Sequence, residues 1–136
     1  MGPFKVLVVE DHADSRQVIS IMLEVCGYQA IEAANGQEAV DLAASHCPDL
    51  ILMDLGLPVL DGVEATRRIR EHEMLRHVPI IACTAYLRED WEARASRAEF
   101  SGFIAKPVDF DSLIRVIERH LPRRADCVGA QEAAVN

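Results

Sequence analysis

Long apolar runs and a secretory leader are both missing from this sequence. Each apolar run, such as residues 5–9 or 79–83, is far shorter than a bilayer-spanning segment and ends in polar residues. Glu10 and Asp11 follow the first apolar run directly, where a signal peptide would carry small residues before its cleavage site. We therefore expect no membrane-spanning segment and a cytoplasmic location.

Paired cysteines are missing too. The four cysteines stand at positions 26, 47, 83 and 127, and no two of them have the CxxC spacing of a redox or zinc motif. Cys26 and Cys83 fall inside apolar patterns, so we expect Cys83 to be a buried small apolar residue. The sequence predicts neither disulfides nor a zinc site.

The chain also lacks an excess of positive charge. Its formal net charge is −8 and its pI is about 5.0. Nucleic acids are bound through clustered Lys and Arg, so this charge argues against a nucleic-acid partner. Acidic side chains can instead attract a metal ion.

The sequence does contain a regular alternation of two patterns within 136 residues, the size of one domain. Short β-branched runs predict strands over 5–9, 29–34, 49–53, 78–83 and 102–105, and helical patterns lie between them. This alternation is typical of an α/β fold with a parallel sheet covered on both faces. We expect one domain over 1–123 and a flexible C-terminal tail over 124–136.

Capping residues predict where the helices begin. Asp14, Asn35 and Asp61 are each followed three residues later by Gln or Glu, as in a capping box, and Asp109 precedes the cleanest apolar stripe. The first helix is expected over 14–26. Its expected buried stripe consists of Val18, Ile21, Met22 and Val25. A weakly amphipathic helix over 88–98, which carries Trp91, is expected to be the loosest.

Chemically active residues stand at the predicted strand ends. Glu10 and Asp11 follow the first strand, Asp54 the third, Thr84 the fourth and Lys106 the fifth. Ligands of open parallel sheets bind beyond these carboxyl ends. Grouped carboxylates repel one another unless a cation neutralises them, and oxygen-only ligands favour Mg²⁺, or Mn²⁺, over Zn²⁺. The sequence predicts a divalent-metal site at this edge.

The same edge is suited to a phosphoryl group. The metal, the Lys106 ammonium and the Thr84 hydroxyl can meet its three equatorial oxygens while Asp54 attacks in line. Asp54 is therefore the expected phosphoacceptor.

Four motifs in order resemble the receiver domain of bacterial response regulators over residues 4–121. They are Val8-Val9-Glu10-Asp11, Asp54-Leu55-Gly56-Leu57-Pro58 with Asp61-Gly62, Thr84-Ala85, and Lys106-Pro107. The resemblance implies a flavodoxin-like, doubly wound, five-stranded parallel sheet with strand order 2-1-3-4-5 and five helices. It also implies phosphoryl transfer from a histidine kinase or histidine phosphotransfer protein. The protein would assist its own phosphorylation and dephosphorylation without being an enzyme on other substrates.

The resemblance assigns further roles. Asp11 is implied as a direct metal ligand, Glu10 as a ligand acting largely through water, and Gly56 as a backbone-carbonyl ligand. Many relatives have Asp where this chain has Glu10. Lys106 would bind a phosphoryl oxygen, aided by Pro107 after a cis peptide bond. Gly56 and Tyr86 would set how fast water removes the phosphoryl group.

Thr84 and Phe103 match the pair whose coupled movement signals phosphorylation in the family. The surface formed by the fourth helix, last strand and fifth helix would then bind a downstream target protein. Phe103 is expected to pack in the core in either state. A monomer or a weak, phosphorylation-dependent dimer is expected.

Two organisations stay open. Residues 75–82 look most like the stand-alone DivK cell-cycle type, and the initial Met and short tail favour an independent protein. A receiver detached from a hybrid histidine kinase would have the same sequence features.

Other functions have weaker support. A Mg²⁺-dependent phosphatase would need an acid at position 56, which is glycine, and a phosphate-independent binding module would need a damaged pocket. A flavin-binding relative would need hydrogen-bond donors where this chain has acids. His12 is expected to be exposed or at a helix entry, and the three arginines 67, 68 and 70 to form a solvated face.

Overall fold

A five-stranded parallel sheet forms the centre of the molecule. The computed structural model describes residues 2–85 and 100–121. The strands are β1 (Lys5–Val9), β2 (Gln29–Ala33), β3 (Leu50–Asp54), β4 (Ile80–Thr84) and β5 (Gly102–Ala105). They lie in the order β2-β1-β3-β4-β5, and every neighbouring pair is parallel. The predicted fold class and strand order are confirmed.

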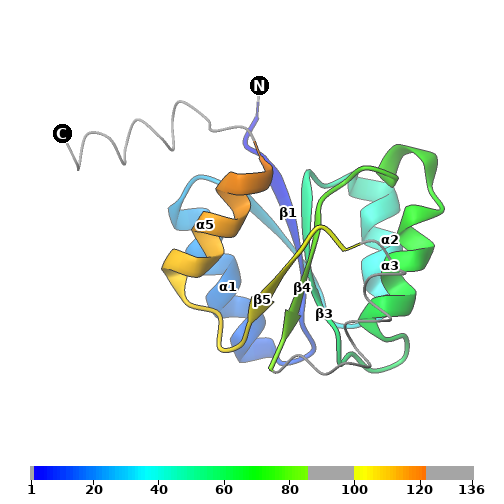
Figure 1. The fold of residues 1–136 in the computed structure, drawn as a ribbon, viewed down its shortest axis with the longest axis horizontal. Helices are drawn as coiled ribbons and strands as arrows, with labels where there is room; N and C mark the ends of the chain where they lie inside the picture. Colours follow the sequence, from blue (N-terminus) through cyan, green and yellow to red (C-terminus); the bar gives the residue numbers. More distant parts are fainter. Residues whose placement is uncertain (1, 86–99, 122–136) are drawn as a thin grey trace.

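Helices cover both faces of the sheet (Figure 1). Helices α1 (Ala13–Val25) and α5 (Phe110–His120) lie on one face, and α2 (Gly36–His46) and α3 (Gly62–Arg70) lie on the other. A short 3-10 helix, η1 (Glu73–Leu75), follows α3. The predicted helix over 88–98, with Trp91, and the tail over 124–136 lie outside the described residues. Within the described ranges no helix has the length and apolarity needed to cross a bilayer.

The central strands supply side chains to both faces, because successive residues of a strand point to opposite sides. On β3, Leu50 and Leu52 pack in the core beneath α1 and α5, whereas Ile51 and Met53 pack in the core beneath α2 and α3. Burying one such side chain stabilises the fold by about 1.5–3 kcal/mol. Two apolar layers therefore hold the sheet and fix where its strands end.

Helix α1 buries a different face from the one predicted. Ile19 and Leu23 are buried beside the sheet, and Met22 packs partly against them. The other predicted members are exposed: Val18 by 51 %, Ile21 by 53 % and Val25 by 73 %. The predicted stripe was wrong because α1 carries two apolar sets at helical spacing, and periodicity alone does not say which one faces the core.

Three of the four predicted helix starts are confirmed. Asn35, Asp61 and Asp109 each accept a hydrogen bond from the amide three residues later, at 2.8–2.9 Å. Asp14 does not cap α1. The N-cap is His12, whose side chain makes no capping hydrogen bond, and Asp14 lies within the first turn.

Candidate functional site

The charged residues predicted at the strand ends lie together. Asp54 ends β3 beside Cys83 of β4, and Thr84 ends β4 beside Ala105 of β5, so the strand ends are level. A cavity of about 280 Å³ opens there. It is lined by Asp11, His12, Asp54, Leu55, Gly56, Thr84, Ala85 and Lys106. We call it the acidic cavity.

Lys106 lies between two carboxylates. Its Nζ is 2.6 Å from Glu10 Oε1 and 3.1 Å from Asp54 Oδ2. Burial by itself lowers the pKa of Lys106, but the hydrogen bond with Glu10 and the charge of Asp54 outweigh it, so its pKa is raised. The ammonium is therefore charged at neutral pH.

Asp54 is a buried carboxylate, with 7 % of the residue exposed. The Gly56 amide donates to its Oδ1 at 3.2 Å. Burial raises the pKa of Asp54, and the nearby Lys106 ammonium only partly opposes this effect. The ionised form of Asp54 is thus less stable here than in water, and an added cation would stabilise it.

Glu10 is buried even more completely, with 2 % exposed, yet it has the opposite shift. Burial raises its pKa, but hydrogen bonds from Lys106 and from the His12 amide outweigh burial and lower the pKa to about 2. Glu10 therefore has stronger internal partners than Asp54 has.

His12 stands at the entry to α1 and is 77 % exposed. Its Nδ1 lies 3.2 Å from Glu10 Oε2 and 3.3 Å from Asp11 Oδ1. The prediction of an exposed or helix-entry position for His12 is confirmed. Glu10, Asp11 and His12 each offer an atom within 4.8 Å of the others, a grouping that could hold a metal ion.

The acidic cavity has donors of the kind that hard cations use. Asp11, Asp54 and Gly56 border it, and they offer carboxylate or carbonyl oxygens. Asp11 keeps 29 % of its side chain exposed, and Asp54 lacks full charge compensation. These residues fit Mg²⁺ or Mn²⁺.

Comparison with known proteins identifies the family. The family model of the response regulator receiver domain matches residues 6–118. The chain belongs to the response regulator receiver family. It is thus a receiver domain of the kind that acts in two-component signalling.

Relatives of this receiver domain include stand-alone proteins and parts of kinases. The polar-differentiation response regulator DivK of Brucella anthropi is 38 % identical over 119 residues, which are 88 % of this chain and 97 % of DivK. The resemblance to the DivK type is therefore confirmed. The receiver domain of the sensor histidine kinase PA1611 of Pseudomonas aeruginosa PAO1 is 39 % identical, with a TM-score of 0.82, and the match covers 88 % of this chain and 98 % of that one.

Two solved structures are relevant to the expected magnesium site and to the expected fold. The PA1611 receiver was crystallised with a magnesium ion coordinated in its active site cleft. The chemotaxis protein CheY4 of Vibrio cholerae is 28 % identical, with a TM-score of 0.85, and the match covers 88 % of this chain and all of that one. The receiver fold is shared across these proteins.

Arg16 supports the receiver site although sequence reasoning missed it. Its guanidinium donates to the Glu10 carbonyl at 2.8 Å and, through Nε, to Glu32 Oε1 of β2 at 3.0 Å. These bonds tie the segment after β1 to α1 and β2. One arginine on a helix gives no sequence signal for such a role.

Two glycines of the receiver hold the segment after β3 in place, and this role was also missed. A Cβ atom on Gly62 would collide with the Asp54 carbonyl, and one on Gly36 would collide with the Leu60 carbonyl. The Gly62 amide donates to the Leu55 carbonyl at 3.1 Å. Only glycine allows these close approaches, and the contact between residues 36 and 60 is not visible in a sequence.

Val59 adopts an unusual backbone conformation in the same segment. Its φ is +68°, and the Leu60 amide donates to the Pro58 carbonyl at 2.7 Å, which makes a γ-turn. A β-branched residue is strained at positive φ. Val59 is also 83 % exposed, so packing does not compensate for the strain.

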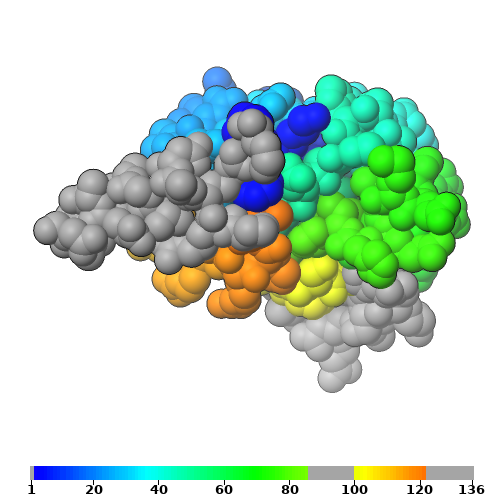
Figure 2. All heavy atoms as spheres, turned by 90° about the horizontal axis from the view of Figure 1, so that it is seen from above, coloured from blue at the N-terminus to red at the C-terminus, as the bar shows by residue number. Residues whose placement is uncertain are grey.

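The predicted switch residues lie around β5. Thr84 is buried and borders the acidic cavity, and the Lys106–Pro107 peptide is cis as expected. The prediction of core packing was wrong for Phe103, which is 39 % exposed. Phe103 lies on β5, an edge strand at the surface beside α5 (Figure 2), and points to the side of the strand opposite to Ile104, which is buried against α5 residues. Tyr86 lies outside the described residues.

The structure also shows the surroundings of Cys83 and of the three arginines on α3. Cys83 is buried as expected, and burial raises the pKa of its thiol to about 12. Arg67 and Arg68 pair with Glu64 on a partly exposed helix face. Arg70 departs from the predicted solvated face, because its guanidinium donates to the carbonyls of residues 75, 76 and 78 and thereby holds the segment before β4.

Proposed function

We propose that Asp54 accepts a phosphoryl group from a phosphohistidine of a partner protein. The observation that carries this proposal is the arrangement around Asp54. A buried carboxylate meets a lysine ammonium at 3.1 Å and also borders a cavity that Asp11 and Gly56 share. Negative charge on Asp54 is only partly compensated, and the remaining space has oxygen donors for a divalent ion.

The transfer step follows from this geometry. A carboxylate oxygen of Asp54 forms a bond with phosphorus while the bond between phosphorus and the donor's imidazole nitrogen breaks, and the electron pair of that bond returns to the nitrogen. When bound, Mg²⁺ or Mn²⁺ neutralises the charge of the phosphoryl oxygens and of Asp54. Asp11, Asp54 and the Gly56 carbonyl would hold the ion.

Lys106 and Thr84 complete the proposed acceptor site. The Lys106 ammonium is already beside Asp54, so it can bind a phosphoryl oxygen with little movement. Thr84 borders the same cavity from the end of β4 and can bring its hydroxyl to another oxygen. These roles predict that loss of Lys106 impairs signalling more than phosphate acceptance.

The proposed output surface is near β5. The Phe103 ring is partly exposed and lies 6.0 Å from the Phe100 ring, centroid to centroid. Movement of Thr84 toward the phosphoryl group would change the packing beside this pair, a population shift between two arrangements. A downstream target would recognise the changed surface of β5 and α5. Phosphorylation-dependent dimerisation through the same surface is an alternative output.

The lifetime of the phosphorylated state depends on water access. Gly56 is exposed at the cavity edge and has no side chain to obstruct water. Tyr86 is the second residue proposed to act on this rate. Gly56 also offers no carboxylate, so the alternative of a phosphatase acting on external substrates gains no support.

Mass spectrometry tests the acceptor role directly. The purified chain is incubated with Mg²⁺ and acetyl phosphate, and intact mass is measured over time. Wild type should gain one phosphoryl group, Asp54→Ala none, and Asp41→Ala, which removes an exposed helix carboxylate, should behave like wild type. A phosphoryl group retained in Asp54→Ala would overturn the proposal, and multiple-turnover hydrolysis of phosphate esters would revive the phosphatase.

Titration with Mg²⁺ tests the metal ligands. Asp11→Asn should weaken Mg²⁺ binding on the order of tenfold or more, because even supporting residues of metal sites have effects of that size. Calorimetry of the metal alone gives this number without phosphoryl transfer. An unchanged dissociation constant would remove Asp11 from the ligand set.

A further inference from the structure

Arg16, near the start of α1, has a largely buried side chain, of which 18 % is exposed. Its Nη1 donates to the Glu10 carbonyl at 2.8 Å, and its Nε donates to Glu32 Oε1 of β2 at 3.0 Å. Burial of a guanidinium is costly unless its N–H groups have partners, so these two bonds fix where the group lies. Arg16 therefore joins α1, the segment after β1 and the edge strand β2.

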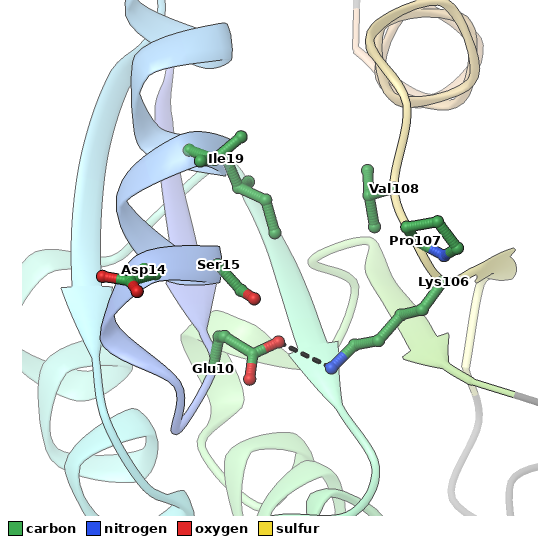
Figure 3. A pocket seen from close by; sticks show the side chains of 8 residues that line it. Glu10, Asp14, Ser15, Ile19, Lys106, Pro107 and Val108 are labelled. Atoms are coloured by element: carbon green, nitrogen blue, oxygen red, sulfur yellow. Dashed lines mark hydrogen bonds and ion pairs between the residues drawn. The ribbon is translucent and has the colours of Figure 1, made fainter.

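The carbonyl that Arg16 holds belongs to the peptide bond between Glu10 and Asp11. That bond is planar, so a fixed carbonyl also fixes the direction in which the Asp11 main chain leaves it. The other attachments of Glu10 are separate, because its amide donates to the Ala33 carbonyl at 3.1 Å and its carboxylate faces Lys106 (Figure 3). Arg16 thus controls the orientation of the main chain that carries Asp11 into the acidic cavity.

We infer that Arg16 is a positioning residue for the metal ion, which holds Asp11 in the orientation that binds the ion, and that Glu32 in turn holds Arg16. This inference rests on the proposed function, because it takes Asp11 as a metal ligand. A ligand that is already oriented loses less conformational freedom on binding, so the ion binds more tightly. Neither Arg16 nor Glu32 lines the acidic cavity, and both act on the ion through Asp11.

The positive charge of Arg16 has the opposite effect on the ion from its positioning. A cation near the site repels Mg²⁺, so charge alone predicts tighter Mg²⁺ binding in Arg16→Gln, whereas loss of positioning predicts weaker binding. Lysine keeps the charge but lacks the planar arrangement of donors that reaches two acceptors at once. Charge alone therefore predicts unchanged Mg²⁺ binding in Arg16→Lys, and loss of positioning again predicts weaker binding.

Calorimetric titration with Mg²⁺ alone measures this difference. Arg16→Gln and Arg16→Lys should each bind Mg²⁺ about tenfold more weakly than wild type, the lower end of the effect of residues that support metal ligands. Arg67→Gln is the matched control, because it removes the same charge from an ion pair with Glu64 on α3, and it should bind like wild type.

Circular dichroism identifies the folded variants, and Arg16→Lys decides the question if Arg16→Gln does not fold. A purely structural role would lower the melting temperature but leave the Mg²⁺ dissociation constant of the folded protein unaltered. That outcome, or tighter binding in either Arg16 variant, would overturn the inference.

A double-mutant cycle tests the part assigned to Glu32. Glu32→Ala should weaken Mg²⁺ binding by about threefold when Arg16 is present and have no effect in the Arg16→Gln background, because residues of one hydrogen-bond network are coupled. Equal weakening in both backgrounds would mean that Glu32 acts through its own charge, which would overturn its role in holding Arg16.

Hydrogen exchange of the metal-free protein gives a second measurement. The peptide that covers residues 10–13 should exchange faster in Arg16→Lys than in wild type, and a peptide from α2 should exchange at the same rate in both. Equal exchange of residues 10–13 would count against the inference. Absence of Mg²⁺ binding by wild type, or unaltered binding by Asp11→Asn, would instead defeat the proposed metal site, so the two failures are distinguishable.

Discussion

The middle of β3 and its last residue differ in what burial does to the free energy of folding. Leu50, Ile51, Leu52 and Met53 are apolar, and their burial stabilises the protein. Asp54 is also buried, and there burial opposes the ionised carboxylate, as its raised pKa shows. One strand thus joins a stabilising segment to the proposed phosphoacceptor, whose charge is disfavoured by burial. Its rigidity holds that residue in place at a cost that the apolar segment offsets.

The largest expected effect comes from breaking the apolar side of this comparison. Leu52→Ala should lower the free energy of unfolding by about 3 kcal/mol, because it leaves a cavity in a closely packed core. Urea denaturation measures the loss. Ile21→Ala, on the exposed face of α1, is the control and should change stability by less than about 0.5 kcal/mol. A large loss in the control would mean that the exposed face of α1 is buried in solution.

Removing the charge of Asp54 should have the opposite sign. Asp54→Asn should raise the free energy of unfolding of the metal-free protein, because it removes a charge that burial disfavours. Asp41→Asn, on an exposed helix surface, should be neutral. Saturating Mg²⁺ should stabilise wild type more than Asp54→Asn, because a ligand stabilises the state that binds it. If Asp54→Asn destabilised the metal-free protein, the charge of buried Asp54 would not be unfavourable for folding.

The pH dependence of stability should separate Asp54 from Glu10. The pKa of Asp54 is raised on folding, so its unfavourable contribution is present above that pKa and disappears as the pH falls below the ordinary value near 3.8. The pKa of Glu10 is lowered from 4.5 to about 2, so its favourable contribution is present above pH 4.5 and is lost as the pH falls toward 2.

Urea denaturation between pH 7 and pH 3 can measure both contributions in metal-free protein. The stability advantage of Asp54→Asn over wild type should shrink as the pH falls. Glu10→Gln should be less stable than wild type at pH 7, and this difference in the free energy of unfolding should also shrink as the pH falls. Parallel curves for wild type and either variant would contradict the corresponding pKa shift.

The smallest predicted effect concerns the backbone of the segment that follows Asp54. Val59→Gly should raise stability by about 0.5 kcal/mol, because relief of strain at positive φ is partly offset by the greater freedom of glycine in the unfolded chain. Val59→Ala keeps a Cβ atom and should show no comparable gain. Thermal unfolding of the two variants measures the difference, and equal behaviour would show that Val59 is not strained.

The sheet and its functional edge could be predicted from sequence for clear reasons. Each central strand is a short apolar run that ends at a polar residue, and in a parallel sheet those ends meet. Asp54 and Lys106 could therefore be expected to converge although 52 positions separate them. Asn35 and Asp61 were recognised as caps from the Glu three positions later, and Asp109 from the apolar stripe that follows it.

Features that depend on distant contacts could not be predicted in this way. The buried face of α1 depends on which of two apolar sets meets the sheet, and the exposure of Phe103 depends on which side of the edge strand β5 is covered. The bond from Lys106 to Glu10 joins residues 96 positions apart and requires atomic geometry. Arg16 was missed for the same reason.

The contact between Gly36 and Leu60 means that a helix outside the acidic cavity constrains the main chain that continues from the cavity's border toward α3. Any larger residue at position 36 would push against the main chain that connects β3 to α3. A substitution on α2 could therefore inactivate the protein while every acidic and basic group of the pocket stays unaltered. Screens for loss of signalling should recover such variants alongside those of Asp54.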